Sequence, residues 1–192
     1  MNYYCIACRT GGEAKVRAHL NKYFVRELGD LNDVKVFYPQ RRMFERRKGK
    51  KLVNDQPILP GYLMVCSEND LTDRMIDIGR IPGSYGFLRN LDRSIILKGA
   101  DLQYAAWIMG NGGMIKPSKA FFKEGEPIKV IEGPLMEMHG KILRVDHRGS
   151  RVLVEFVFAN EVRKVSMPVE FVDSDEKNTN LIYDTSSYGA IL

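Results

Sequence analysis

The side chains with the chemistry for catalysis or metal binding in this chain are three cysteines and three histidines (Cys5, Cys8, Cys66, His19, His139 and His147). Cys5 and Cys8 have the CxxC spacing of a redox pair, which needs both sulfur atoms close together at the start of a helix. The surrounding residues 3–8 read as a strand, in which positions three apart point to opposite faces. A zinc site needs four ligands, and only Cys66 and the scattered histidines could complete one. We therefore interpret the cysteines as small buried residues with free thiols, and we predict no metal and no cofactor.

The histidines give no further support to an enzyme. They fall on an expected helix, beside a glycine and in an expected turn, and none has a paired acid or nucleophile nearby. Walker, GxGxxG, HExxH and GxSxG motifs are missing from the sequence. The enzyme hypothesis therefore depends on the CxxC spacing alone, and a strongly depressed cysteine pKa would be needed to support it. A non-catalytic binding protein is the preferred interpretation.

The most unusual composition lies between residues 41 and 51, where seven cations stand against a single carboxylate, Glu45. Such a segment has little apolar surface to bury, so it projects into solvent and attracts a polyanion, most often nucleic acid phosphate. Phe44 lies inside the run, where its ring could stack on an unpaired base. The residues predicted to bind nucleic acid are Arg41, Arg42, Phe44, Arg46, Arg47, Lys48, Lys50 and Lys51.

Charge is distributed unevenly along the chain. Residues 1–110 hold 18 Lys and Arg against 12 Asp and Glu, a net charge of +6. Residues 123–173 hold 8 against 9, a net charge of −1. This asymmetry predicts nucleic acid binding by the amino-terminal part of the chain, and a protein partner or only weak nucleic acid binding for the carboxy-terminal part.

Hydrophobic periodicity predicts an α+β domain in the first part. A strand over residues 3–8 precedes a capping box, in which Thr10 and Glu13 would satisfy each other's backbone amides. The helix that follows is expected to bury Val16, Leu20, Phe24 and Leu28 and to end at Gly29. Further strands are expected over 34–38, 62–65 and 83–88, with helices opening at 67–70 and running over 101–109. With the cationic ribbon counted as one strand, the order β-α-β-β-β-α-β-α is typical of helices packed against a mainly antiparallel sheet.

The carboxy-terminal part changes to short strands and tight turns. Strands are expected over 128–131, 141–145, 152–158, 162–167 and 169–172, a spacing typical of a small closed barrel. Gly140 is expected at a position with no room for a Cβ. Residues 111–122 are interpreted as a flexible linker because of their glycine, proline and serine content, and the polar tail over 174–192 as loosely ordered.

Length and hydropathy limit the class of protein further. A chain of 192 residues allows one domain or two small ones. No apolar run approaches the roughly 18 residues of a membrane helix, and the amino terminus lacks the basic segment of a signal peptide. We therefore expect a cytoplasmic monomer that does not associate with membranes.

Three segments resemble landmarks of NusG-family transcription elongation factors. Tyr3-Tyr4-Cys5-Ile6 is similar to the opening Trp-Tyr strand of that family, and Leu59-Pro60-Gly61-Tyr62-Leu63-Met64-Val65 resembles its Phe-Pro-Gly-Tyr strand. Residues 125–134 and 139–146 resemble the KOW motif. The resemblance implies an NGN domain over 1–110, an antiparallel sheet with flanking helices, joined by a flexible linker over 111–122 to an SH3-like all-β KOW barrel over 123–173.

The resemblance also implies a surface for RNA polymerase. In NusG-like proteins the amino-terminal domain binds the polymerase clamp helices through an apolar-aromatic hollow, and the matching positions here are Tyr3, Leu59, Tyr62 and Met64. The alternative is that Tyr62 and Met64 simply pack under a helix. The cationic ribbon would lie near upstream DNA or the nascent RNA.

For the barrel, the resemblance implies protein partners. The family's KOW barrel recruits a ribosomal protein or the termination factor Rho through a Phe-Gly-Arg turn, and the corresponding turn here reads Ala159-Asn160-Glu161. Asn160 can take the left-handed conformation of the glycine, but the aromatic ring and the cation are lost. Phe158 could replace the ring, so Phe158 and Asn160 are the expected partner-binding residues.

This departure from the family pattern favours a specialised paralogue of the RfaH or LoaP kind, which promotes read-through of long operons. Housekeeping NusG is the first alternative, and a KOW-containing ribosome-associated protein is the second. The concentration of basic residues in the amino-terminal part favours a transcription factor, because ribosomal proteins usually spread theirs throughout.

Overall fold

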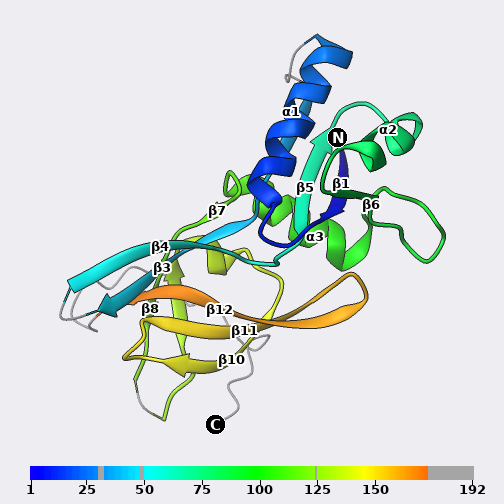
Figure 1. The fold of residues 1–192 in the computed structure, drawn as a ribbon. Coiled ribbons are helices and arrows are strands. Elements are labelled where there is room, and N and C mark those ends of the chain that lie inside the picture. Colours follow the sequence, from blue (N-terminus) through cyan, green and yellow to red (C-terminus); the bar gives the residue numbers. More distant parts are fainter. Residues whose placement is uncertain (30–32, 48–49, 124, 173–192) are drawn as a thin grey trace. The chain divides into compact units, whose positions relative to one another are not determined.

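The computed structural model describes residues 1–29, 33–47, 50–123 and 125–172, with the backbone alone described for Arg46, Arg47, Lys50 and Lys51 (Figure 1). The chain forms two compact units. The first combines Met1–Gln40 with Pro57–Met114, and the second combines Arg41–Gln56 with Ile115–Leu192. The predicted tail over 174–192 lies outside the described residues. The cationic ribbon, expected as part of the first 110 residues, thus groups with the carboxy-terminal segment.

The described residues of the first unit form a four-stranded sheet with three α-helices, which the sequence predicts except that the cationic ribbon, expected as a fifth strand, lies in another sheet. Its strands are β1 (Asn2–Cys8), β2 (Val34–Phe37), β5 (Tyr62–Ser67) and β6 (Ser84–Phe87), in the order β2-β5-β1-β6. All neighbours in this sheet pair antiparallel. The helices are α1 (Glu13–Leu28), α2 (Met75–Arg80), preceded by the 3-10 turn η1 (Thr72–Arg74), and α3 (Gly99–Gly110). The family's mixed α+β architecture is confirmed.

Both faces of this sheet are covered by helices. Alternate residues of β1 and β5, such as Ile6 and Leu63, are fully buried in one core cluster with Leu20 of α1 and Ile78 of α2. Cys5 and Met64 point to the opposite face and are also buried, and α3 contacts both of their strands. A four-stranded sheet with two covered faces therefore leaves little open apolar surface at its centre.

Two helix starts differ from the sequence prediction. The capping box is wrong, because Gly12 occupies the cap position of α1 and no side chain caps the helix. The Glu13 side chain is instead directed to a distant backbone amide, which is described below. The second helix begins later than 67–70, because Asp70 accepts hydrogen bonds from the backbone and the hydroxyl of Thr72 and closes a separate turn first.

The second unit contains a five-stranded sheet in the order β10-β11-β12-β8-β9. Its strands are β8 (Ser118–Phe121), β9 (Lys129–Glu132), β10 (Lys141–Asp146), β11 (Arg151–Phe158) and β12 (Glu161–Phe171), with the 3-10 turn η2 (Pro134–Met136) between β9 and β10. Gly140 is confirmed as a position without room for a side chain, since its Cβ would lie 2.9 Å from the carbonyl oxygen of Glu155.

Two sequence predictions for the barrel are corrected here. Residues 118–121, expected in a linker, form β8 and pair with both β12 and β9. Residues 161–171, expected as two strands, form one. β12 pairs antiparallel with β11 up to Pro168 and then parallel with β8 from Val169. Proline has no amide hydrogen to donate to a ladder, so the strand changes partner at the residue where the sequence suggests a break.

The cationic ribbon forms a hairpin of β3 (Gln40–Arg47) and β4 (Lys50–Pro57), and the short strand β7 (Met114–Ile115) lies beside β3. Lys48 lies outside the described residues. In the part of the chain that the structure describes, no helix is long and apolar enough to cross a bilayer.

Candidate interaction surfaces

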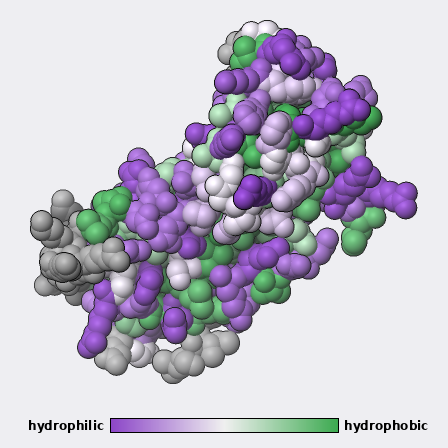
Figure 2. Space-filling view, viewed as in Figure 1, coloured by the Kyte–Doolittle hydropathy of each residue, from purple (hydrophilic) through white to green (hydrophobic). Residues whose placement is uncertain are grey.

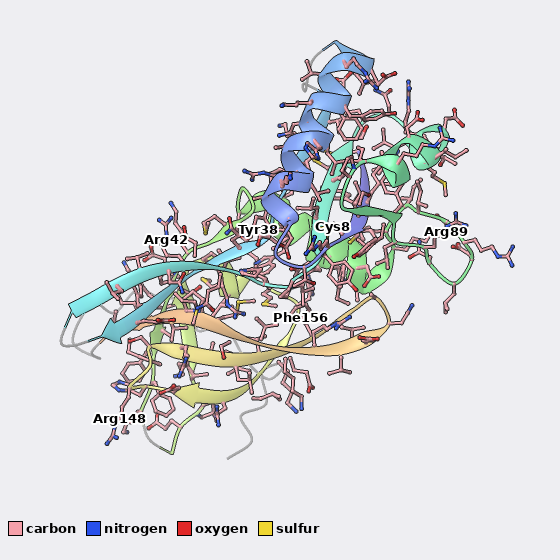
Figure 3. All side chains as sticks on the ribbon, viewed as in Figure 1. Cys8, Tyr38, Arg42, Arg89, Arg148 and Phe156 are labelled. Atoms are coloured by element: carbon pink, nitrogen blue, oxygen red, sulfur yellow. The ribbon has the colours of Figure 1, made fainter. Side chains whose placement is uncertain are left out.

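The Pro-Gly-Tyr segment is fixed to the sheet by a buried carboxylate. Glu13, only 2% exposed, accepts a hydrogen bond of 2.7 Å from the backbone amide of Gly61. Its other oxygen accepts a weaker bond of 3.4 Å from the Tyr38 hydroxyl. The carbonyl of Gly61 accepts a bond of 2.8 Å from the amide of Cys8. Tyr38 and Cys8, labelled in Figure 3, lie near the start of α1. These bonds determine where β5 begins.

Glu13 is ionised in this site although it is buried. Burial raises its pKa, but hydrogen bonds from the backbone amides of Glu13, Gly61 and Gly11 and from Tyr38 outweigh burial and hold the pKa below its usual value. Gly61 itself has φ of +86°, and a Cβ there would lie 3.2 Å from the Cys8 carbonyl oxygen. Only glycine fits this close approach comfortably.

The structure brings three of the four expected polymerase-binding residues onto one sheet face. Tyr3 pairs with Cys66 in the ladder, Met64 with Cys5, and Tyr62 with Ala7, which places these side chains on the same side. Tyr3 and Tyr62 are half-buried and partly accessible. Met64 is only 2% exposed, so the alternative interpretation, packing under a helix, describes it better.

Leu59, the fourth expected residue, precedes β5 and is 5% exposed. It therefore offers almost no surface to a partner. Phe37 of β2 was not singled out in the sequence, although it pairs with Met64 in the ladder and is half-buried on the same face as Tyr62. The alternation in residues 34–38 contains this signal, since it directs Phe37 away from the side of Val34 and Val36.

The described part of the hairpin is less free than its composition suggests. Arg42 forms a two-bond ion pair with Asp55 of β4, at 2.9 and 3.0 Å. This hydrogen bonding lowers the pKa of the Asp55 carboxyl. Because β4 extends to Pro57, the hairpin includes a second carboxylate, Asp55, beyond the segment 41–51. Arg41 donates to Gln56 at 3.5 Å, and Phe44 is half-buried.

A second basic surface lies in the first unit between α1 and α2. His19, Lys22, Arg26 and Arg80 line a hollow of about 470 Å³ together with Asp77. Figure 2 shows hydrophilic side chains over the outer face of α1. Lys22 and Arg26 lie on α1, and Arg80 comes from α2.

The barrel turn has the left-handed geometry expected from its sequence. Asn160 has φ of 58°, which confirms the prediction, and Ala159 is also left-handed at 55°. With Phe158 and Glu161 as the last pair of the ladder, these two residues form a tight two-residue turn. Phe158 is fully buried and cannot replace the lost ring, because the alternation of β11 directs it inward with Phe156.

The exposed apolar side chains beside this turn are different ones. Val157 is 47% exposed and Val162 61% exposed, and the two face each other across the ladder. Alternation along β11 and β12 predicts this exposed pair, but neither residue stands out in the sequence as a binding residue.

The cysteines are buried and unpaired, as predicted. Burial raises the pKa of Cys5 well above its usual value, and burial together with the Glu13 charge raises the pKa of Cys8 to about 11. Raised values disfavour the thiolate that redox chemistry needs. Among the described residues, no group of three or more His, Cys, Asp or Glu side chains is placed to hold a metal ion.

These observations describe a chain built from a helix-covered sheet unit and a small barrel unit with a cationic hairpin. A family model described as "Transcription termination factor nusG" matches residues 1–103. The chain belongs to the NusG family. This match confirms the resemblance found in the sequence, and it supports a transcription factor rather than an enzyme.

Relatives named "Transcription termination/antitermination protein NusG" match along most of the chain. The protein from Bacillus subtilis is 30% identical over 183 residues, which cover 91% of this chain and 98% of the relative. The Pseudomonas aeruginosa protein is 28% identical over 137 residues, covering 70% and 74%. The Escherichia coli K12 protein is 24% identical over 156 residues, covering 79% and 84%.

A solved structure, "Domain interaction in Thermotoga maritima NusG", has the same fold. It matches with a TM-score of 0.54 at 20% identity and covers 87% of this chain and 93% of that one. This likeness supports the fold of the two units and nothing finer.

Proposed function

We propose that this protein is a transcription elongation factor that binds RNA polymerase through the sheet face of its first unit. The observation that carries the proposal is the fixed Pro-Gly-Tyr strand, on which Tyr62 lies in the same face as Tyr3 and Phe37. Half-buried aromatic rings on a rigid strand give a large contact area at a small entropy cost. Leu59 and Met64 act beneath this face as support, because both are buried.

Tyr62→Ala tests the polymerase contact. The variant should weaken binding to core RNA polymerase by about 1–3 kcal/mol, the range of an aromatic hot spot, while the unit stays folded. Affinity can be measured by fluorescence anisotropy and folding by circular dichroism. Tyr85→Ala is a matched control, because Tyr85 on β6 is another tyrosine of this unit, is 73% exposed and is not one of the residues expected to bind polymerase. If Tyr62→Ala unfolds the unit and its folded fraction binds normally, Tyr62 is a core residue and the assignment is wrong.

The cationic hairpin supplies a second contact, with DNA or nascent RNA. The segment 41–56 holds seven cations, and one of them, Arg42, forms an ion pair with Asp55. A protein that holds polymerase and also contacts the nucleic acid upstream or downstream of it would favour processive elongation and antitermination. The hollow lined by Lys22, Arg26 and Arg80 is the alternative place for this contact.

We further propose that the protein acts in the cytoplasm as a monomer. The finer part of the proposal is a specialised role in read-through of particular long operons. It depends on the barrel turn, where Ala159 and Glu161 stand in place of an aromatic ring and a cation, and where Phe158 is buried. A partner such as a ribosomal protein would then contact Asn160 together with the exposed Val157 and Val162. Housekeeping NusG remains the alternative, and the names of the relatives favour it.

A further inference from the structure

A cluster of aromatic side chains lies at the carboxyl ends of β8, β10 and β12. The rings of His147 and Phe171 stack with their centroids 4.5 Å apart and their planes at 28°. The Phe122 ring lies 6.3 Å from His147 and 6.1 Å from Phe171. Phe44 of β3 faces the same region of this unit, because it lines one hollow together with His147 and Phe171. Nothing in the family resemblance assigns a role to this cluster.

The hollow has a volume of about 540 Å³, within the range of roughly 300–1,000 Å³ that holds small planar ligands. Its wall consists of Phe44, His147, Arg148, Ser150, Val169, Glu170 and Phe171. Val169 is fully buried, whereas His147, Arg148 and Glu170 are exposed. The hollow thus combines aromatic rings with one cation and one carboxylate that are open to solvent.

The turn that carries His147 and Arg148 is held in place before any ligand arrives. Asp146 accepts hydrogen bonds from the amide of Gly149 and from Arg151, both at 2.8 Å. These two partners lower the pKa of the Asp146 carboxyl. The carbonyl of Ser150 accepts a bond of 3.0 Å from the amide of Val169. A turn fixed at both ends loses little entropy when it binds a ligand.

The charge around the hollow favours a polyanion. Phe44 lies within the segment 41–51 with its seven cations, and Arg148 extends from the turn between β10 and β11, where Figure 3 labels it. The net charge of −1 over residues 123–173 predicts weak nucleic acid binding for the barrel alone. The hairpin belongs to the same unit as the barrel and adds the missing cations.

We propose that this hollow binds an unpaired base of single-stranded nucleic acid. The base stacks on the rings of His147 and Phe44, as bases stack on aromatic side chains in single-strand binding proteins. Glu170 can accept a hydrogen bond from a base N–H group such as N3–H of uracil or thymine, and Arg148 and the cationic hairpin add positive charge for the flanking phosphates. An apolar peptide would leave Arg148 and Glu170 without partners, so it fits less well. This proposal rests on the proposed nucleic acid contact of the hairpin, because the hairpin cations would attract the phosphates on either side of the stacked base.

The test compares oligonucleotides that carry the same number of phosphates, with and without bases. The full chain is titrated against fluorescein-labelled 12-mers of uridine RNA, thymidine DNA and an abasic strand with the same phosphates, with affinity followed by anisotropy. The chain should bind the strands with bases about 5- to 150-fold more tightly than the abasic strand, the loss expected for one stacked base. His147→Ala should reduce the affinity for uridine RNA to that for the abasic strand, with an unchanged salt dependence.

Two further variants sharpen the result. His139→Ala is the matched control, because His139 is also exposed in the barrel unit but does not line the hollow, and it should leave every affinity unchanged. Phe44→Ala should reproduce the His147 effect from the other wall. A 2-aminopurine base in the RNA reports stacking directly, since its fluorescence should be quenched by the wild type and recover in both hollow variants.

The outcomes separate this site from the hairpin contact. If the chain binds the abasic and uridine strands equally tightly and with a steep salt dependence, the hollow does not bind a base. The proposed contact between the hairpin and phosphate is then still supported. Equal behaviour of His147→Ala and His139→Ala also overturns base binding in the hollow. The absence of any binding overturns both, whereas polymerase binding through Tyr62 is measured independently. A preference for RNA over DNA supports the site with an added contact to the 2′-hydroxyl, and equal affinities support recognition of base and phosphate alone.

Discussion

Replacing Glu13 should destabilise the first unit in a way that depends on pH. Glu13→Ala leaves the buried amide of Gly61 without its 2.7 Å partner, and an unsatisfied buried donor costs about 1–3 kcal/mol. The loss of the weaker 3.4 Å bond to Tyr38 adds to this, so we expect a total of about 2–4 kcal/mol. Glu13→Gln keeps the shape and one acceptor but loses the charge, and should cost about 1–2 kcal/mol at pH 7.

The pH dependence follows from the lowered pKa of Glu13. Its folded-state pKa lies below the value of about 4.3 for an unfolded glutamate, so the ionised carboxylate stabilises the fold above that pH. This stabilisation is lost as the pH falls through the folded-state pKa. The Gln variant does not titrate, so the difference in unfolding free energy between wild type and Glu13→Gln should be largest at pH 7 and shrink below about pH 4.

Urea denaturation followed by the fluorescence of Trp107 measures this difference. Trp107 is the single tryptophan and is 5% exposed on α3, so it reports the first unit. Other carboxylates with lowered pKa values, such as Asp70, titrate equally in both proteins and cancel in the comparison. Glu68→Gln, at an exposed position, is the control and should change stability by less than about 0.5 kcal/mol. A difference that stays constant from pH 7 to pH 3, or a Glu13→Ala variant as stable as wild type, refutes the anchoring role.

Three further predictions concern the barrel and the hairpin. Gly140→Ala should destabilise the barrel by about 1–3 kcal/mol, because the new Cβ meets the Glu155 carbonyl oxygen at 2.9 Å. The barrel amides should then exchange hydrogen faster. Gly79→Ala is the control, because a Cβ at Gly79 meets no atom within 4 Å, and it should leave this exchange unchanged. Serine at positions 46, 47, 48 and 50 should flatten the slope of log K against log salt for duplex DNA by two or more units. Arg42→Ser should change that slope less, because Asp55 already pairs with Arg42. If the slope is unchanged in the four-residue variant, the hairpin does not bind DNA, and the hollow with Lys22, Arg26 and Arg80 becomes the candidate site. The full chain should not compete with a housekeeping NusG for Rho, and measurable competition would contradict the specialised role.

The strands and helices of this fold that depend on local hydrophobic periodicity are predicted well from the sequence. Alternation and helical periodicity give the strands β1 and β5, the helix α1 and its end at Gly29, where φ is +85°. The burial of the cysteines also follows from the pattern, because Cys5 and Cys8 lie in the apolar strand β1 and Cys66 lies near the end of the apolar strand β5. The same reasoning could have found the inward direction of Phe158, since β11 alternates regularly from Val152 onward.

The features that the sequence does not predict depend on contacts between distant residues. The strand β8 has only four residues, and its pairing with β12 joins Ser118 to Val169, some fifty positions apart. Its glycine- and proline-rich surroundings indicate a linker when read alone. Glu13 matches a capping box locally, but its carboxylate accepts a hydrogen bond from the amide of Gly61, 48 residues away, instead of from the amide of Thr10. A buried charge accepts the strongest donors that the fold brings to it.

The division of the chain into units changes where its charge lies, and with it the kind of partner that each part favours. In the first unit, residues 1–40 and 57–114 hold 11 Lys and Arg against 10 Asp and Glu, so this unit is almost neutral. The segment 41–56 alone holds seven cations against two carboxylates. A neutral unit with half-buried aromatic rings on one sheet face suits a protein partner, whose binding depends little on salt. The hairpin instead suits phosphate, whose binding falls steeply with salt. Raising the salt concentration should therefore release nucleic acid from this protein well before it releases polymerase.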